Sequence, residues 1–435
     1  MSTKPGLLFI SHRLLFPPDK GERIRGWALL RHLAATYDIY LGCLTDEPVE
    51  PRSLEALRGV CAEVAVFGMH RRWQKVWALL RLRPGRALML DYYQRDGLQR
   101  WVDGVVGRHR LDVVYIYSTA MAPYVFRGAA PDPARGLCPL DPHQGLKPLD
   151  PHDEKAIPRL ILDMQDIDSE KWTSYAAQSA WPMRLIWARE GRTLLAYERA
   201  AAHACDSTLL VTEKEARRFI ELAPESAARI DWLEHGVDAE RFAPGPFPDP
   251  YAGLPGAGPD IVFTGNMDYW PNADAAIWFA REAMPGLRQR WPELRFHVVG
   301  ANPGAEVLQL AQLAGVHVTG RVADVRPYVA HAALAVAPLR IARGIQNKVL
   351  EAMAMAKPVV ASPGAFEGIR AEAGRDLLIA DGVAETVRRV LEVLDGQHAG
   401  LGPAARARIE AGYSWQSGMA RLDRILAAVT MEAGR

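Results

Sequence analysis

Short apolar runs alternate with longer amphipathic stretches along almost the whole chain. The runs are rich in Val, Ile and Leu, as expected of strands buried on both faces of a parallel sheet, and the stretches between them have helical spacing. This alternation predicts repeated β-α units. The expected strands are 7–10, 39–44, 64–67, 113–117, 160–162, 208–211 and 229–232, followed by 261–263, 294–299, 316–319, 334–336 and 358–361.

A segment rich in proline and glycine, residues 244–259, separates the two series of strands. Such a composition continues neither a helix nor a central strand, so it predicts an interdomain linker. We therefore expect an α/β protein with two doubly wound, Rossmann-like domains, 1–243 and 260–412, which face each other across a cleft. Residues 413–435 contain an amphipathic helix from Trp415 to about Ala428, which we expect to cross back and pack on the N-terminal domain.

Residues 130–158 interrupt the first domain with a near repeat, in which Asp-Pro-His occurs at 141–143 and again at 150–152. Two such units raise the hypothesis of a metal site. Because proline-rich segments seldom hold ligands at a fixed geometry, we favour a flexible insertion.

The composition is that of a soluble globular protein, with 49% hydrophobic and 24% charged residues. The net charge of +1 gives no general argument for nucleic-acid binding. Four scattered cysteines without a CxxC pair suit a reducing compartment and argue against a disulfide framework or structural zinc. The residues before the first strand are too few for a signal peptide, and no apolar run has the length of a membrane span, so we expect a cytoplasmic protein.

Residues 70–83 contain five Arg or Lys, two Trp and no acidic residue. On a helix, this pattern fits either an anionic membrane surface or a packed helix with a solvated basic side. The stretch 183–195 is a second, weaker case. The sequence thus allows a peripheral position on the inner face of the cytoplasmic membrane.

The order strand, loop, helix, strand in residues 334–361 predicts a ligand site at the edge of the second sheet. The backbone N–H groups from Gly344 to Asn347 would point at an anion at the helix N-terminus, with Arg343 and Lys348 beside them. This combination predicts a phosphate site.

Glu351 follows Lys348 by one helical turn and is flanked by apolar residues. A carboxylate in such packing needs a partner, and it can accept hydrogen bonds from two hydroxyl groups. Phosphate donors beside a diol acceptor describe a nucleotide-sugar site. The alternative is a surface helix with ordinary charges.

Two stretches make the chain resemble the retaining GT-B glycosyltransferases of family four: Glu-His-Gly-Val-Asp at 234–238 with Phe-Ala-Pro at 242–244, and Leu-Glu-Ala-Met-Ala-Met-Ala-Lys-Pro-Val-Val at 350–360. The resemblance spans nearly the whole chain outside 130–158. A narrower similarity, to the branch associated with the PEP-CTERM/exosortase system and exopolysaccharide synthesis, rests on the motifs within 11–25, 163–172 and 264–272.

The resemblance implies a metal-independent transferase that needs no cofactor and moves a sugar, with retention, from a nucleotide-sugar to a glycan or lipid-linked acceptor. The second domain would bind the donor and the first domain the acceptor. The implied donor-binding residues are Gly21, Gly265, Asn266, Arg343, Gly344, Asn347, Lys348 and Glu351. The implied acceptor-binding residues are His12, Arg23, Asp163 and Asp166, and the candidate catalytic residues are Asp166, Arg343 and Lys348.

The chain departs from the family pattern at two places. Arg343 stands where the family has a glutamate, eight positions before Glu351, and the loop 265–272 lacks the usual cations. Because a diphosphate needs positive charge, Arg343 and Lys348, with Arg340 or Arg321, are the expected replacements.

Three alternatives remain open at this stage. Asp166-x-Asp168 resembles the metal-binding triplet of the other major glycosyltransferase fold, but the two-domain pattern opposes that fold. A GT-B epimerase would share the donor site, although no convincing acid and base pair is evident for it. A non-catalytic nucleotide-sugar or glycan-binding protein is the third alternative, which the departure at Arg343 favours.

Overall fold

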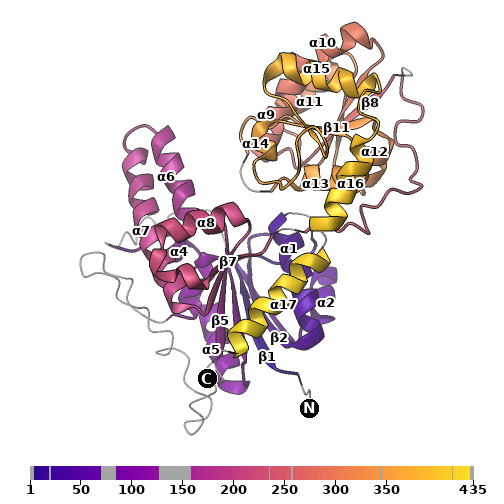
Figure 1. Ribbon diagram of the computed structural model, residues 1–435. Coiled ribbons are helices and arrows are strands. Elements are labelled where there is room, and N and C mark those ends of the chain that lie inside the picture. The colour runs from indigo at the N-terminus through magenta and orange to yellow at the C-terminus, as the bar shows by residue number, and fades with distance from the viewer. Residues whose placement is uncertain are drawn as a thin grey trace. The chain divides into compact units, whose positions relative to one another are not determined.

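The computed structural model describes residues 4–18, 21–69, 85–126, 158–234, 236–255, 258–342, 345–413 and 415–431. The chain divides into two compact units. Unit 1 comprises Met1–Glu234 with Met419–Arg435, and unit 2 comprises His235–Gly418. Each unit is an all-parallel sheet with helices packed against it (Figure 1).

Unit 1 contains a seven-stranded sheet in the order β3-β2-β1-β4-β5-β6-β7. Its strands are β1 (Gly6–Ser11), β2 (Asp38–Thr45), β3 (Glu63–Gly68), β4 (Val113–Tyr117), β5 (Arg159–Gln165), β6 (Ser207–Leu210) and β7 (Ile230–Trp232). Its α-helices are α1 (Gly21–Thr36), α2 (Pro51–Arg58), α4 (Leu88–Tyr92), α5 (Asp96–Arg108), α6 (Asp168–Gln178), α7 (Met183–Ala204) and α8 (Glu213–Leu222), with 3-10 turns at Thr119–Tyr124 and Pro224–Arg229. All seven strands expected from the apolar runs are confirmed.

Unit 2 contains a six-stranded sheet in the order β10-β9-β8-β11-β12-β13. Its strands are β8 (Asp260–Thr264), β9 (Arg295–Val299), β10 (Val316–Gly320), β11 (Leu334–Ala337), β12 (Val359–Ala361) and β13 (Leu378–Ile379). Its helices are α9 (Trp270–Trp278), α10 (Met284–Arg290), α11 (Ala305–Gln309), α12 (Arg326–His331), α13 (Asn347–Ala354), α14 (Pro363–Phe366), α15 (Gly382–Leu394) and α16 (Leu401–Gly412), with a π-helical turn at Phe279–Ala283 and a 3-10 turn at Leu310–Gln312. The expected strands are confirmed, and β13 is additional.

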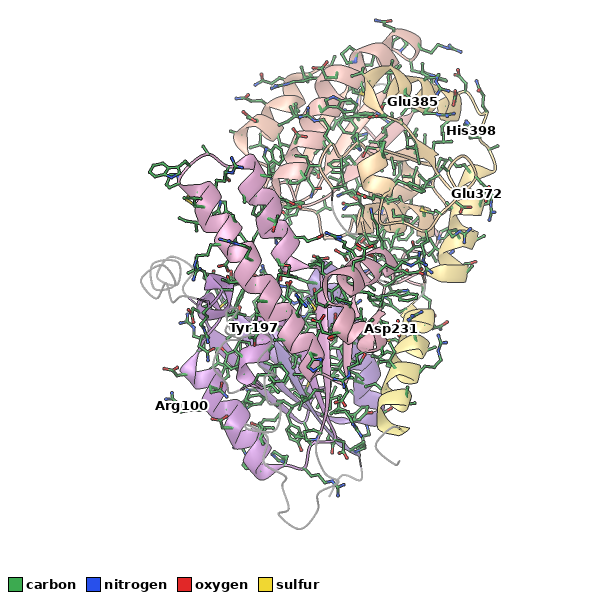
Figure 2. All side chains as sticks on the ribbon, turned by 60° about the vertical axis from the view of Figure 1, so that its left-hand side comes forward. Arg100, Tyr197, Asp231, Glu372, Glu385 and His398 are labelled. Carbon is green, nitrogen blue, oxygen red and sulfur yellow. The ribbon has the colours of Figure 1, made fainter. Side chains whose placement is uncertain are left out.

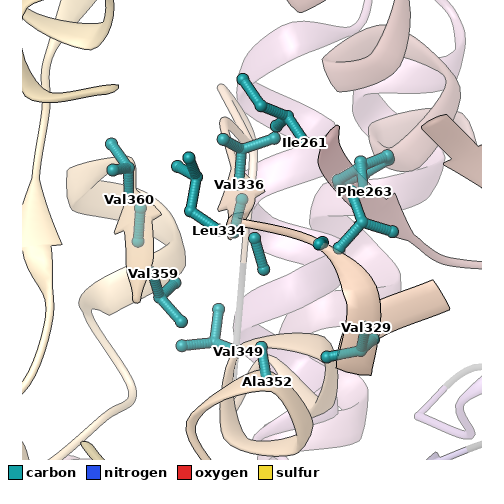
Figure 3. Close-up of a cluster of buried hydrophobic side chains, with 14 of the residues drawn as sticks. Ile261, Phe263, Val329, Leu334, Val336, Val349, Ala352, Val359 and Val360 are labelled. Atoms are coloured by element: carbon teal, nitrogen blue, oxygen red, sulfur yellow. The ribbon is translucent and has the colours of Figure 1, made fainter. Parts of the chain in front are cut away.

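One part of the unit 2 core lies between its central strands and α13. Val349 and Ala352 on α13 point toward Val359 on β12, and Leu334 and Val336 lie above them on β11 (Figure 3). This packing holds the first turn of α13 beside the carboxyl end of β11.

The described part of residues 244–259 packs on unit 2. The buried ring of Tyr251 stacks on His297, with centroids 4.1 Å apart, and its hydroxyl donates to the carbonyl of Tyr328 at 2.7 Å. His331 Nε2 lies 2.8 Å from the carbonyl oxygen of Phe247. The contact boundary of the units therefore falls at Glu234, ahead of the proline-rich segment.

The last helix, α17 (Trp415–Met431), begins in unit 2 and ends in unit 1. Met419, Leu422, Ile425 and Leu426 are buried, and they form one face of the helix. Arg421 pairs with Asp231, which lies beside α17 (Figure 2), and its guanidinium lies 3.6 Å from the ring centroid of Trp232. Arg421 thus fastens α17 to β7 of unit 1.

Candidate functional site

The order of the strands in unit 2 reverses between β8 and β11. The chain continues from β8 toward β9 on one side and from β11 toward β12 on the other, so the loops that follow these two strands diverge. Open parallel sheets bind ligands in the crevice that such a divergence leaves at the carboxyl edge. The candidate donor site lies in these two loops.

The first turn of α9, which follows β8, and the first turn of α13, which follows β11, are joined by a side-chain contact. Lys348, in the first turn of α13, donates from Nζ to Oδ1 of Asn272 at 2.9 Å. The amide of Asn272 donates to the carbonyl of Asn266 at 2.9 Å. Two residues predicted for the donor site, Asn266 and Lys348, are therefore connected through Asn272, which the sequence analysis did not assign.

Glycine allows the backbones at this edge to approach closely. A Cβ atom on Gly265 would lie 2.8 Å from Nδ2 of Asn272. Gly300, after β9, has φ +154°, and a Cβ atom there would lie 1.7 Å from the carbonyl oxygen of Gly265. Only glycine fits at position 300. The close contact fixes the position of Gly265, which is a predicted donor-binding residue.

Lys348 and Glu351 are half-buried on the same side of α13, and burial acts on both charges. Burial raises the pKa of Glu351 to about 7, against the opposing effect of the Lys348 ammonium. Burial likewise lowers the pKa of Lys348 to about 8, which Glu351 partly offsets. A ligand that supplies negative charge at Lys348 and hydroxyl donors at Glu351 would favour the charged forms of both groups.

Arg340, a further cation near this edge, already has a partner. Its Nε, in the loop after β11, donates to Asp274 at 2.9 Å and fastens that loop to α9. At the opposite end of α13, Arg406 Nη1 donates to the carbonyl of Ala354 at 2.7 Å, and it donates to that of Ala239 at the same distance. A cation there complements the helix dipole and holds α13 in place.

Two predicted residues, Arg343 and Gly344, lie outside the described residues. Asn347 begins α13, and the N–H groups of a first helical turn have no intrahelical acceptors. The structure thus brings together Gly265, Asn266, Asn347, Lys348 and Glu351 at one edge of unit 2. Their role as donor ligands stays a prediction.

In unit 1, the order of the strands reverses between β1 and β4. His12 directly follows β1, and its Nδ1 lies 3.4 Å from the carbonyl oxygen of Tyr117 at the end of β4. Its Nε2 lies 3.3 Å from Glu22 in the first turn of α1, which Gly21 begins. His12 and Gly21, predicted for the acceptor and the donor respectively, thus lie at one switch point.

Glu22 is a further polar group at this point that sequence reasoning missed. Arg13 Nε lies 2.6 Å from Oε1 of Glu22, and the hydroxyl of Tyr117 donates to the backbone carbonyl of Glu22. Burial raises the pKa of Glu22, but His12, Arg13 and Arg23 outweigh it and lower the pKa to about 2. Glu22 is therefore an anion that holds His12 and Arg13 at the sheet edge.

Two arginines of α1 are buried. Arg25 is completely buried and donates from Nη2 to Oδ2 of Asp163 at 2.8 Å. The hydroxyl of Tyr115 donates to the same oxygen at 2.7 Å. Arg23 is 3% exposed and donates from Nη2 to Glu47 at 2.6 Å. In these contacts Asp163 and Arg23 are structural, and their proposed acceptor contacts stay predictions.

The chain leaves β5 through a strained residue. Gln165 has φ 69° at an irregularity in the pairing with β6, and its buried Nε2 has no hydrogen-bond partner among the residues that the structure describes. Such strain in a non-glycine residue is concentrated at ligand sites. The next residue, Asp166, is exposed at this edge, as a ligand for acceptor hydroxyls would be.

Asp168, the first residue of α6, was considered only as part of a metal triplet. Burial is the main reason that the pKa of Asp168 is raised to about 6. The Lys171 ammonium opposes this effect, and the Asp166 carboxylate adds to it. Glu198 on α7 is completely buried, and its Oε1 accepts from the backbone N–H of Ser169 at 3.2 Å. Burial raises the pKa of Glu198 to about 8. The edge of unit 1 thus carries acids whose charge changes near neutral pH.

In the described part of the chain, no group of three or more His, Cys, Asp or Glu side chains is arranged to hold a metal ion. None of its helices is both long and apolar enough to cross a membrane.

Residues 258–396 match the family described as glycosyl transferases group 1. No curated protein sequence matches the chain.

Solved structures resemble the whole chain at low identity. Alr3699/HepE of Anabaena in complex with UDP has a TM-score of 0.64 and 15% identity, and the match covers 97% of this chain and 100% of that one. Sucrose-phosphate synthase of Thermosynechococcus elongatus has a TM-score of 0.63 and 16% identity over 98% and 100% of the two chains. A glycosyltransferase of Rickettsia africae has a TM-score of 0.63 and 11% identity over 99% of each chain. The two parallel-sheet units therefore have the GT-B fold, as the sequence predicted.

Proposed function

We propose that this chain, which has the GT-B fold and a glycosyl transferases group 1 match at residues 258–396, moves a sugar from a nucleotide-sugar to an acceptor. The acceptor is a glycan or a lipid-linked saccharide, and the transfer retains the anomeric configuration. The reaction belongs to exopolysaccharide synthesis on the cytoplasmic side of the membrane. It requires neither a metal ion nor a cofactor.

The contact between Lys348 and Asn272 carries this proposal. It places an ammonium group between the first turns of α9 and α13, the helices that follow the two diverging loops, one helical turn before Glu351. Lys348 then binds the diphosphate, together with Arg343 and the N–H groups at the start of α13. Glu351 accepts hydrogen bonds from the ribose hydroxyls.

Catalysis in this proposal is the stabilisation of charge on the departing diphosphate. Fixed cations and N–H groups perform this task without reorganising during the reaction. The departing phosphate itself accepts the proton of the acceptor hydroxyl, which Asp166 and His12 orient at the edge of unit 1. A dedicated protein base is then unnecessary.

A uridine nucleotide is the first donor to test. The Anabaena protein has been solved with UDP, with UDP and glucose, and with UDP-glucose. The full chain should be incubated with a panel of UDP-, GDP- and ADP-sugars without an acceptor, and the products followed by chromatography.

Slow release of a nucleoside diphosphate, with the sugar transferred to water, supports a transferase. Interconversion of sugar nucleotides would indicate an epimerase, and tight binding of an unchanged ligand would indicate a binding protein. Either of these two results contradicts the proposal. Lys348→Ala should abolish the release, whereas Lys214→Ala, at an exposed position on α8 of unit 1, should not.

A further inference from the structure

The helical hairpin of α6 and α7 projects from unit 1 beyond the carboxyl ends of its strands (Figure 1). Its end carries a group of exposed side chains, which we call the hairpin tip: Tyr175, Trp181, Met183, Arg184 and Leu185. Trp181 is 78% exposed and Leu185 is 62% exposed. Large apolar side chains gathered in this way are characteristic of an interaction surface.

The hairpin is held rigidly below its tip. The rings of Trp172 and Trp187 stack with centroids 4.8 Å apart. A Cβ atom on Gly191 would lie 2.6 Å from Oγ1 of Thr173, so the two helices are in close contact there. The hairpin is therefore a stiff support, and the exposed tip is its unsupported end.

Two buried glutamates anchor the base of α7. Glu190 accepts from the backbone N–H groups of Leu88 and Met89, at 2.8 Å each. Glu198 accepts from the N–H of Ser169 at the start of α6. These contacts fix the direction of the hairpin relative to the sheet of unit 1.

The tip carries one exposed cation, Arg184, and no acidic residue. No acid occurs between residues 171 and 189. The other two cations of this stretch lie away from the tip: Lys171 is in the first turn of α6, beside Glu170, and Arg189 donates to the carbonyl of Arg86 at 3.1 Å. Aromatic and aliphatic side chains with a cation beside them and no acid nearby fit the interfacial layer of an anionic lipid bilayer.

We infer that the hairpin tip is a docking surface for anionic phospholipid membranes, with Trp181 and Leu185 inserted among the lipids. The first residues of the stretch 183–195, which the sequence suggested, are part of the tip, whereas Trp187 in the same stretch is stacked on Trp172. The 70–83 segment, for which membrane binding was also predicted, lies outside the described residues.

The position of the tip has a consequence for the proposed acceptor. α6 has 11 residues and begins at the sheet edge that carries Asp166, so its far end is roughly 16 Å away at 1.5 Å per residue. A docked tip would therefore hold this edge within about that distance of the membrane. This consequence rests on the proposed function, but membrane docking itself does not.

The test is flotation of the full chain with two kinds of vesicle. One is made of phosphatidylcholine alone, and in the other about 30% of the lipid is phosphatidylglycerol. We expect binding to the anionic vesicles only. High salt should weaken this binding, because the charge of Arg184 contributes to it. Trp181→Ser with Leu185→Ser should reduce the bound fraction at least about 10-fold, and Arg184→Glu should reduce it less.

The matched control is Leu308→Ser with Leu313→Ser, which removes two exposed leucines from unit 2 and should leave flotation unchanged. Equal flotation of the tip variant and the unaltered chain would overturn the inference. Failure of the unaltered chain to bind anionic vesicles would also overturn it. So would a dimer of the unaltered chain without lipid that the tip substitutions dissociate, because the tip would then be a self-association surface. Nucleoside diphosphate release, measured without vesicles, is independent of all these outcomes.

Discussion

Arg25 and Asp163 form a completely buried ion pair between α1 and β5, with Nη2 2.8 Å from Oδ2. Arg25 also donates to the carbonyl of Leu233, and Tyr115 donates to Asp163. One guanidinium group thus connects β5, α1 and the end of β7 under the proposed acceptor edge. Burial lowers the pKa of Arg25, but the Asp163 carboxylate outweighs this effect and raises the pKa, so the arginine remains charged.

Removing one member of this pair should destabilise unit 1 strongly. Asp163→Ala leaves the Arg25 charge buried without its partner, and such changes cost about 3–5 kcal/mol. The double variant Arg25→Met with Asp163→Leu should lose less than the sum of its single changes. Hydrogen exchange of the β1, β4 and β5 amides reports on unit 1 alone and measures these losses.

The control for this prediction is Arg199→Ala, which breaks the more exposed pair of Arg199 with Glu225 in the same unit. Pairs of that kind contribute about 0–1 kcal/mol. If Asp163→Ala cost no more than Arg199→Ala, the buried pair would not support the sheet as argued.

Lys348→Ala and Glu351→Gln should each weaken nucleotide-sugar binding while leaving the fold intact. Each removes a charge-assisted hydrogen bond to the ligand, which corresponds to a loss of about 10-fold to 100-fold in affinity. Calorimetric titration with the donor found in the sugar-nucleotide panel measures the effect. Glu385→Gln on α15, drawn in Figure 2, is a half-buried control in the same unit and should bind as the unaltered chain does. Unchanged affinity in both variants would remove the donor-site assignment.

The affinity for the nucleotide should have a maximum between about pH 7 and pH 8. Below it, Glu351, with its pKa raised by burial to about 7, becomes protonated and loses acceptor capacity. Above it, Lys348, with its pKa lowered by burial to about 8, loses its charge. Titrations from pH 5.5 to 9.5 (steps of about half a unit) should show both limbs, and Glu351→Gln should remove only the acid limb. A flat profile would show that neither group contacts the ligand.

Glu351 affects the pH dependence of folding stability in the opposite direction. Its pKa in the folded state is raised above the ordinary value of 4.5, so folding favours the protonated form. Its contribution to the stability of unit 2 is fully present below pH 4.5 and is lost as the pH rises through about 7. Ligand affinity and stability therefore change in opposite directions over this range, as expected of a group retained for binding.

The sequence predicted the strands well because buried parallel strands are continuous apolar runs, such as Val113–Tyr117. β13 was missed because Leu378–Ile379 is too short to form a run. The partner of Asp163 could not be predicted, since Arg25 lies 138 positions away and the pairing depends on the packing of α1 against the sheet. Asn272 was missed for the same reason, because its partner Lys348 lies 76 positions away.

The backbone of Gly300 lies in close contact with that of Gly265, which allows the loop after β8 to be tested. A Cβ atom on Gly300 would lie 1.7 Å from the carbonyl oxygen of Gly265, and φ +154° disfavours any other residue. Gly300→Ala must displace the loop after β8 and with it Asn266 and the partner of Lys348, at a cost of about 2–5 kcal/mol from strain and overpacking. We expect lower thermal stability of unit 2 together with weaker nucleotide-sugar binding. Gly304→Ala, where an added Cβ atom meets nothing within 4 Å, is the matched control and should change stability by less than about 1 kcal/mol. A Gly300→Ala variant that is destabilised but binds the nucleotide normally would separate this loop from the donor site.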